Sequence, residues 1–122
     1  MTDHITTTVD TYFAMWNEPD TAKRAEHIER AWAGDGAYAD PLLQAEGHAA
    51  LSDMVAGVHA QFPGYRLSRL SGIDAHNGHI RFNWHLAGPE GEVAVAGVDV
   101  GQLTDDGRLR RITGFFGEPP AA

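Results

Sequence analysis

The spacing of the apolar residues changes near residue 65, and this change limits the folds open to the chain. Up to residue 62 the apolar side chains recur at every third or fourth position, as they do along one face of a helix. From residue 65 onward they recur at every second position, which is typical of a strand with one buried face. Helices followed by strands in consecutive hairpins predict an α+β domain, with three N-terminal helices packed on a mainly antiparallel sheet.

Residues that start or stop a helix give the bounds of the three predicted helices. The first covers about residues 4 to 17 and ends at "NEPD". The second begins after the N-cap residue Asp20 and runs through Trp32, with its charged residues in water. The third covers about residues 48 to 62 and ends at "PG". Before it comes a short extended piece, "AYADP", in which Pro41 keeps Asp40 out of helical geometry.

Turn sequences divide the second half of the chain into strands. "HNGH", "GPEG" and "DDGR" separate residues 65 to 117 into four strands joined as consecutive hairpins. In "HIRFNWHL" the aromatic and aliphatic side chains alternate with Arg81, Asn83 and His85. Glycines at 97, 101 and 114 suit a sheet that curves strongly enough to enclose an apolar pocket.

Composition limits the functions that need consideration. The 122 residues, 43 % of them hydrophobic, fit one domain over residues 1–122 with a loose tail at about 118–122. Because there is no cysteine, disulfides and thiolate chemistry are excluded. The net charge of −8 disfavours nucleic acid and anionic membranes as partners, and the few basic residues, Arg24 and Arg108 among them, are interpreted as solvated. The polar N-terminus and the lack of a long apolar segment predict a cytoplasmic protein.

The seven histidines do not follow the spacing of metal ligands, so neither a metal nor another cofactor is predicted. Carboxylates are the better candidates for chemistry. Asp99 lies within "VAVAGVDVGQL", an apolar strand in which both same-face neighbours, Gly97 and Gly101, lack side chains. Such a position leaves room for a ligand, and desolvation there raises the pKa of a carboxylic acid. The alternative is a buried aspartate satisfied by backbone or arginine contacts.

Two further residues are candidates beside Asp99. Asp40 ends the short extended piece, at the edge of the same apolar region, although it can equally be a turn or cap residue. Tyr12 lies beside the apolar stripe of the first helix, where its hydroxyl needs a buried partner, although it can simply pack there.

The order of these segments resembles the NTF2-like superfamily, a cone-shaped α+β fold that includes SnoaL-like polyketide cyclases and ketosteroid isomerases. The resemblance covers nearly the whole chain. "YFAMWNEPD" is similar to the isomerase segment with the oxyanion-hole tyrosine, and "GDGAYADP" to the segment that ends in the general-base aspartate. "VAVAGVDVGQLTDDGRLRRITGFFGE" is similar to the final hairpin with the protonated aspartate. The resemblance therefore implies catalytic roles for Tyr12, Asp40 and Asp99, with Asp99 kept neutral by its apolar surroundings as in ketosteroid isomerase.

The resemblance implies a cofactor-independent enzyme that acts on a small hydrophobic carbonyl compound. Asp40 would remove a proton next to the carbonyl group, and Tyr12 with neutral Asp99 would hold the enolate oxygen. Return of the proton elsewhere gives an isomerase, whereas attack on a second carbonyl gives an aldol-type polyketide cyclase. The predicted substrate-binding residues are Trp16, Met54, Val58, Phe82, Trp84, Leu86 and Phe116.

Two alternatives remain open. Some relatives open epoxides with an Asp-Arg-Asp arrangement, which would require Arg81 to face inward, but we expect the aromatic residues that alternate with it to be inside. In a non-catalytic protein, Asp99 would be a satisfied core acid and the chain would bind a hydrophobic ligand or a protein partner. A homodimer through the sheet is expected in either case, because a second apolar face needs cover. That face carries Ala94, Ala96, Val98 and Val100.

Overall fold

The computed structural model describes residues 2–122 and contains three helices and seven strands in that range. The first half of the chain forms α1 (Thr2–Asn17), α2 (Thr21–Ala31), β1 (Trp32–Ala39), β2 (Gln44–Glu46) and α3 (His48–Gln61). The second half forms β3 (Arg66–Arg69), β4 (Asp74–His76), β5 (His79–Ala87), β6 (Val93–Leu103) and β7 (Leu109–Phe116). The strands form one mixed sheet in the order β2-β1-β7-β6-β5-β3, with β4 also beside β5. The α+β architecture predicted from the change in apolar spacing is confirmed.

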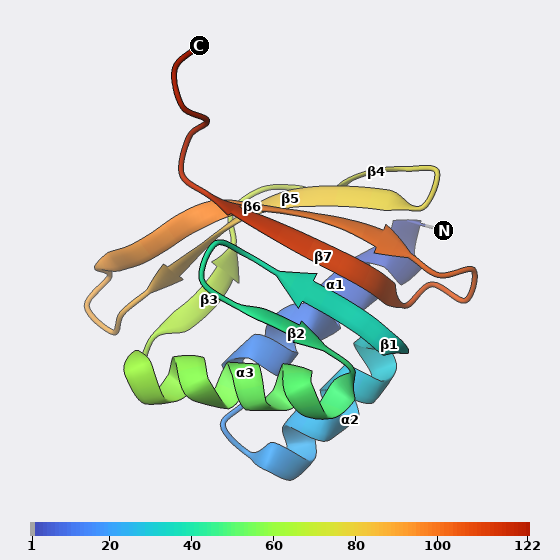
Figure 1. The fold of residues 1–122 in the computed structure, drawn as a ribbon, viewed down its shortest axis with the longest axis horizontal. Coiled ribbons are helices and arrows are strands. Elements are labelled where there is room, and N and C mark those ends of the chain that lie inside the picture. Colours follow the sequence, from blue (N-terminus) through green and yellow to red (C-terminus); the bar gives the residue numbers. More distant parts are fainter. Residues whose placement is uncertain (1) are drawn as a thin grey trace.

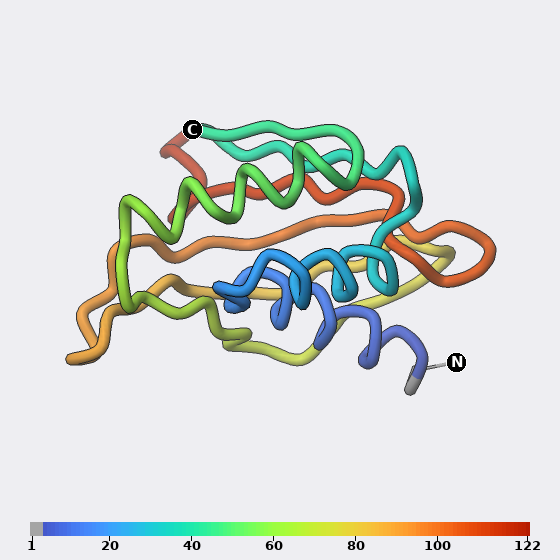
Figure 2. The backbone as a smooth tube through the Cα atoms, turned by 90° about the horizontal axis from the view of Figure 1, so that it is seen from below, coloured from blue at the N-terminus to red at the C-terminus, as the bar shows by residue number. Residues whose placement is uncertain are grey.

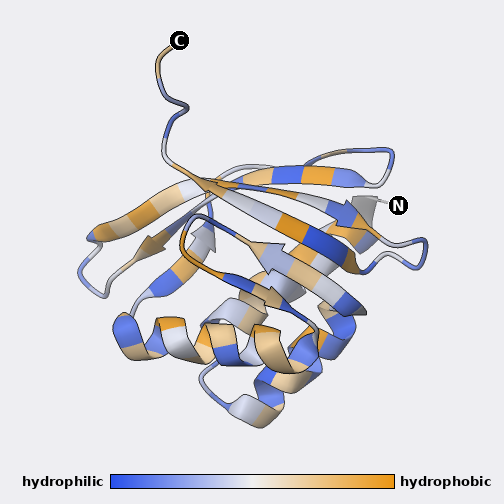
Figure 3. Cartoon of the chain, in the orientation of Figure 1, coloured by the Kyte–Doolittle hydropathy of each residue, from blue (hydrophilic) through white to orange (hydrophobic). Residues whose placement is uncertain are grey.

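The three helices lie on one side of the sheet (Figure 1). Seen from that side, α1 and α2 lie next to each other and α3 runs along the part of the sheet near β1 and β2 (Figure 2). The core between the layers contains large side chains from both, including Tyr12, Met15, Trp32, Phe82 and Ile112. Figure 3 shows hydrophilic residues at the turns between strands and both hydrophobic and hydrophilic residues along strands such as β5 and β7. All pairs of neighbouring strands are antiparallel except β1 and β7, which are parallel.

The second helix differs from its prediction in two respects. Asp20 is the N-cap, and its Oδ2 atom accepts a hydrogen bond from the Lys23 N–H at 2.8 Å, as predicted. However, α2 ends at Ala31, because Trp32 is already extended and begins β1. The prediction that Arg24 faces water is wrong, since only 3 % of this residue is exposed. Its Nε atom donates to Ser52 Oγ at 3.0 Å and its Nη1 atom to the Glu18 carbonyl at 2.7 Å, so Arg24 joins the three helices.

The sheet contains more strands than the sequence predicts. The three predicted turns all connect strands, and in the first of them Asn77 and Gly78 adopt the positive φ angles of a tight hairpin. The first of the four predicted strands is split into β3 and β4, which both pair with β5. Between them Ser71 Oγ accepts a hydrogen bond from the Asn83 N–H, in place of a regular ladder bond. The strand β2 was not predicted at all.

The chain beyond β7 is exposed and extends away from the sheet (Figure 1). The strong curvature expected from the glycines stays a prediction. Among the helices of residues 2–122, none combines the length and the apolar character needed to cross a membrane.

Candidate active site

An apolar cavity of about 80 Å³ lies between the helices and the sheet. Its walls come from α1, α3, the β1–β2 connection and the strands β5, β6 and β7. Five of the predicted substrate-binding residues line it: Trp16, Val58, Trp84, Leu86 and Phe116. The other two, Met54 and Phe82, pack into the hydrophobic core instead. Phe82 faces inward but lies deeper in the sheet, where it contacts Phe13 with 5.4 Å between ring centroids.

Tyr12 and Asp99 form a buried hydrogen-bonded pair at this cavity. The Tyr12 hydroxyl donates to Asp99 Oδ2 at 2.7 Å, and each residue is only 1 % exposed. Asp99 lies in the middle of β6, opposite Phe82 on β5 and Gly114 on β7. Its second oxygen, Oδ1, is buried without a hydrogen-bond partner. The carboxyl group therefore has one satisfied oxygen and one that is free to bind a ligand.

Burial controls the ionisation of this pair. Burial raises the pKa of Asp99, hydrogen bonding from Tyr12 and Trp84 lowers it, and the negative charge of Asp40 raises it, so that the pKa of Asp99 is about 7 overall. The Trp84 indole N–H is close enough to favour the carboxylate, although it does not reach the geometry of a full hydrogen bond. Burial and the nearby Asp99 also raise the pKa of Tyr12 well above its ordinary value. Asp99 can thus carry a proton near neutral pH and donate it in a hydrogen bond.

Asp40 lies in a different environment, half-buried in the connection between β1 and β2. Its Oδ1 atom accepts hydrogen bonds from the N–H groups of Leu42 and Leu43 at 2.9 and 2.8 Å. Its Oδ2 atom accepts a hydrogen bond from the Tyr38 hydroxyl at 2.7 Å. Asp40 is therefore both a turn residue and a carboxyl group at the cavity wall.

Gly114 brings the two carboxyl groups into one neighbourhood. A methyl group at this position would lie 2.9 Å from Asp99 Oδ1 and 3.3 Å from Asp40 Cβ. It would also lie 3.4 Å from the Tyr38 hydroxyl, so these three side chains surround the space above one glycine. Sequence reasoning missed Tyr38. The available signal was its position two residues before Asp40, which puts both side chains on the same face of an extended segment.

Arg81 lies on the outside of the sheet, as expected. Two thirds of its side chain is exposed, and its Nε atom donates to Asp74 Oδ2 at 2.9 Å. The hydrolase alternative, which needs Arg81 inside, is therefore wrong. Within residues 2–122, no three His, Asp or Glu side chains are grouped as metal ligands would be.

Comparison with known proteins relates the chain to one family. The SnoaL-like domain matches residues 9–112 of the chain. A crystal structure of a putative isomerase of the SnoaL-like family from Agrobacterium tumefaciens strain C58 has 35 % sequence identity and a TM-score of 0.88, with 95 % of this chain and 99 % of that chain covered. A search of curated proteins finds no match.

More distant structures share the fold alone. A putative SnoaL-like polyketide cyclase from Jannaschia sp. CCS1 has a TM-score of 0.68 at 16 % identity, with 91 % of this chain and 85 % of that chain covered. A protein from Catenulispora acidiphila with a ketosteroid isomerase-like fold, in complex with trimethylamine, has a TM-score of 0.71 at 13 % identity, with coverages of 90 % and 85 %. The sequence match over most of the chain and the similarity to the Agrobacterium structure have one consequence: the chain belongs to the SnoaL-like family of the NTF2-like superfamily.

Proposed function

We propose that the chain is an enzyme that forms and stabilises an enolate from a small carbonyl compound, without a cofactor. The observation that carries this proposal is the Tyr12–Asp99 pair at the wall of an apolar cavity, with an O···O distance of 2.7 Å. Donors aimed at a developing oxyanion in a water-poor site are among the strongest sources of catalysis. The putative isomerase and cyclase relatives agree with this class of reaction.

The reaction begins with proton transfer to Asp40. Its carboxylate takes the proton from the carbon next to the carbonyl, and the electrons of that C–H bond form the enolate. The carbonyl oxygen, now negative, accepts hydrogen bonds from protonated Asp99 and from Tyr12, whose hydroxyl hydrogen turns from Asp99 Oδ2 toward the ligand. Asp40 then returns the proton to another carbon, which gives an isomer. In a substrate with a second carbonyl group, the enolate carbon attacks that group instead, and a new C–C bond closes a ring. The attacked carbonyl oxygen becomes an alkoxide, which takes the proton held by Asp40.

The test uses a substrate small enough for the cavity. Cyclohex-3-enone should be converted to the conjugated cyclohex-2-enone, which is followed by its ultraviolet absorbance. Asp40→Asn should lower the rate by about 10²–10⁴-fold because the base is lost. The exposed Asp35→Asn is the matched control and should keep the wild-type rate. The rate should also fall as the pH rises through about 7, because Asp99 then loses the proton that it donates.

A wild-type rate in Asp40→Asn would contradict the proposed base. A chain that binds ketones without converting them would support the second candidate function, a non-catalytic protein that binds a hydrophobic ligand or a protein partner. One observation favours this candidate: all three hydrogen bonds to Asp40 come from its own turn and from Tyr38, which is what a purely structural aspartate also needs.

We also propose that a second copy of the chain covers the outer face of the sheet. This face carries exposed apolar residues, with Val100 at 40 % and Phe115 at 56 % exposure. Phe115 lies directly opposite Val98 on the neighbouring strand, so the apolar residues form one continuous patch. Sedimentation should give the mass of a dimer for the wild type and of a monomer for Phe115→Arg. A monomeric wild type would contradict the proposal.

A further inference from the structure

Two tryptophans in the cavity wall have indole N–H groups without a partner. Trp16 comes from α1 and Trp84 from β5, and both are buried, with 7 % and 5 % of their surface exposed. In both, the Nε1 atom is buried without a hydrogen-bond partner in the part of the chain that the structure describes. An indole nitrogen can only donate, and a buried donor without an acceptor destabilises the folded chain. An acceptor atom on a ligand would remove this cost.

The two indoles lie beside the Tyr12–Asp99 pair. Trp84 packs over Gly97, where a methyl group would come within 3.0 Å of its ring, and Gly97 is two residues from Asp99 on β6. Trp16 contacts the Tyr12 ring edge to face, with 6.4 Å between centroids. The N–H of Trp84 lowers the pKa of Asp99, and that of Trp16 lowers the pKa of Tyr12, as donors near these oxygens would. The two donors thus lie beside the Tyr12–Asp99 pair, Trp84 near the Asp99 carboxyl group and Trp16 near the Tyr12 hydroxyl.

Comparison with a third tryptophan, Trp32, shows that the position at the cavity wall matters as well as the unpaired N–H group. The Nε1 atom of Trp32 is also buried without a partner, but Trp32 packs in the core against Tyr12 rather than in the cavity wall. An unpaired indole is therefore not a binding site by itself. Trp16 and Trp84 differ because they border the cavity, next to a carboxyl oxygen that is also unpaired.

The charges around the cavity limit the ligand further. Among the described residues that line it, the charged side chains are two acids, Asp40 and Asp99, and there is no lysine, arginine or histidine. An anionic ligand would meet one or two carboxylates in a medium of low dielectric constant. A cation would find the acids but would leave the two indole donors unpaired. An uncharged ligand with acceptor oxygens is not repelled by the two acids and can accept hydrogen bonds from the two indole donors.

We propose that Trp16 and Trp84 donate hydrogen bonds to oxygen atoms of the ligand, so that the cavity selects uncharged ketones or esters over acids and amines of the same shape. This inference rests on the proposed function, in which the reacting group is a carbonyl. It adds two ligand-binding residues to the Tyr12–Asp99 pair and a charge selectivity to the substrate class. The cavity volume of about 80 Å³ restricts such ligands to small ones unless the walls move.

The test compares ligands of one shape and different charge. Cyclohexanone, cyclohexylammonium and cyclohexanecarboxylate are titrated into the full-length chain, and binding is followed by calorimetry. Cyclohexanone should bind most tightly, and Trp84→Phe or Trp16→Phe should weaken it by about tenfold each, since the ring stays and one hydrogen bond is lost. Trp32→Phe is the matched control and should change the affinity less than twofold. Tighter binding of the ammonium or the carboxylate, unchanged affinity in both cavity variants, or no binding of cyclohexanone to the wild type would overturn the inference.

A second measurement uses the wild-type chain, so that it does not depend on variants that fold poorly. In the wild-type chain, cyclohexanone should shift two of the three indole N–H signals in a ¹⁵N correlation spectrum, and Trp32→Phe should remove the signal that does not shift. A shift of the Trp32 signal alone would overturn the inference. The outcome is separable from that of the proposed function: if cyclohexanone binds through the indoles but cyclohex-3-enone is not isomerised, only the proposed function fails. If isomerisation occurs and the indole variants bind normally, only this inference fails.

Discussion

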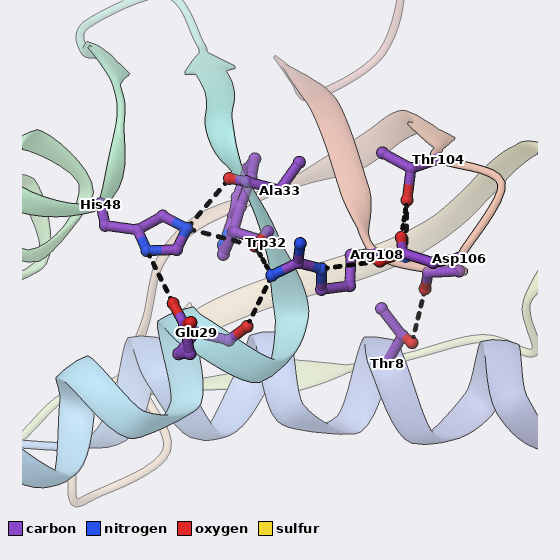
Figure 4. Close-up of polar contacts among 9 residues, drawn as sticks. Thr8, Glu29, Trp32, Ala33, His48, Thr104, Asp106 and Arg108 are labelled. Atoms are coloured by element: carbon purple, nitrogen blue, oxygen red, sulfur yellow. Dashed lines mark hydrogen bonds and ion pairs between the residues drawn. The ribbon is translucent and has the colours of Figure 1, made fainter.

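Polar side chains gather at two places in this molecule, and they differ in how completely they are paired. At the cavity, Asp99 Oδ1 and the indole nitrogens of Trp16 and Trp84 are buried without partners. At the other end of the sheet, near the β6–β7 turn, a group formed by Thr8, Glu29, His48, Asp106 and Arg108 is held by hydrogen bonds and ion pairs (Figure 4). We call this group the β6–β7 network.

Backbone carbonyls supply most of the acceptors in the β6–β7 network. Arg108 Nη1 donates to the carbonyls of Glu29 and Trp32, both at 3.1 Å. His48 Nε2 lies 2.9 Å from the Ala33 carbonyl and 3.1 Å from that of Trp32, while its Nδ1 atom lies 3.3 Å from Glu29 Oε2. These contacts hold the end of α2 and the irregular start of β1 to the β6–β7 turn. The polar side chains of the β6–β7 network are thus paired and hold the fold together, whereas three polar groups at the cavity wall have no partner among residues 2–122, where a ligand is proposed to bind.

The largest predicted effect arises at the cavity, where the ionisation of Asp99 should make the stability of the chain depend on pH. Because the pKa of Asp99 is about 7 in the folded chain and 3.8 in its ordinary state, the folded chain keeps a proton that the unfolded chain loses between about pH 4 and 7. Stability is therefore lost as the pH rises through this window, by about 4 kcal/mol. Asp99→Asn removes this loss, so the free energy of unfolding of the wild type should fall relative to the variant between about pH 4 and pH 8. Urea denaturation at several pH values measures it, and a constant difference would contradict the burial of an ionisable Asp99.

Gly114→Ala should damage the cavity without disturbing the β6–β7 network. The added methyl group would lie 2.9 Å from Asp99 Oδ1, so the carboxyl group must move away from its position beside Tyr12. We expect the isomerisation rate to fall by about 10–100-fold, equivalent to about 1–3 kcal/mol of transition-state stabilisation. Gly57→Ala is the matched control, because a methyl group there meets nothing within 4 Å. A Gly114→Ala variant with normal activity would mean that the space above Gly114 is not used.

The sequence predicts the inner residues of the sheet better than the contacts between elements. The burial of Asp99 follows from an apolar strand with glycines on both sides, and the inward position of Trp84 follows from simple alternation. The pairing of Asp99 with Tyr12 joins residues 87 positions apart, so no local pattern contains it, and the resemblance implied only that both residues hold the same substrate oxygen. Asp40 shows the limit of that resemblance, because its turn contacts suit a structural role and a catalytic role equally.

The predictions of solvent exposure failed mainly for charged residues. Arg24 has the spacing of a solvated residue on α2, but it is buried because its guanidinium finds acceptors on α3 and at the end of α1. Arg108 was also interpreted as solvated, but it donates to the carbonyl groups of Glu29, in the last turn of α2, and Trp32, at the irregular start of β1. Such acceptors depend on tertiary structure, and a pattern of residue types does not reveal them.

Arg108→Met tests whether the β6–β7 network contributes to stability and not to activity. The variant keeps a long apolar side chain but loses the donors to the Glu29 and Trp32 carbonyls. We expect the free energy of unfolding to fall by about 1–2 kcal/mol and the isomerisation rate to stay within about twofold, since Arg108 is remote from the cavity lining. Arg110→Met, at an exposed position on the neighbouring strand β7, is the control and should change neither quantity. A large loss of activity in Arg108→Met would show that the two places are coupled.

Thr8→Val is the smallest and most selective change. Thr8 is 5 % exposed, and its Oγ1 atom donates to the Gly107 carbonyl at 3.0 Å, which joins α1 to the β6–β7 turn. Valine has nearly the same shape, so the variant removes one hydrogen bond with little change in packing, and unfolding should become easier by about 1 kcal/mol. Thr11→Val, whose hydroxyl bonds to the Thr7 carbonyl within the exposed part of the same helix, should cost less. If both variants are equally stable, the hydrogen bond to Gly107 adds nothing. If Thr8→Val also changes ketone binding, α1 transmits changes from the network to Tyr12, and the separation between structural and ligand-binding polar groups must be abandoned.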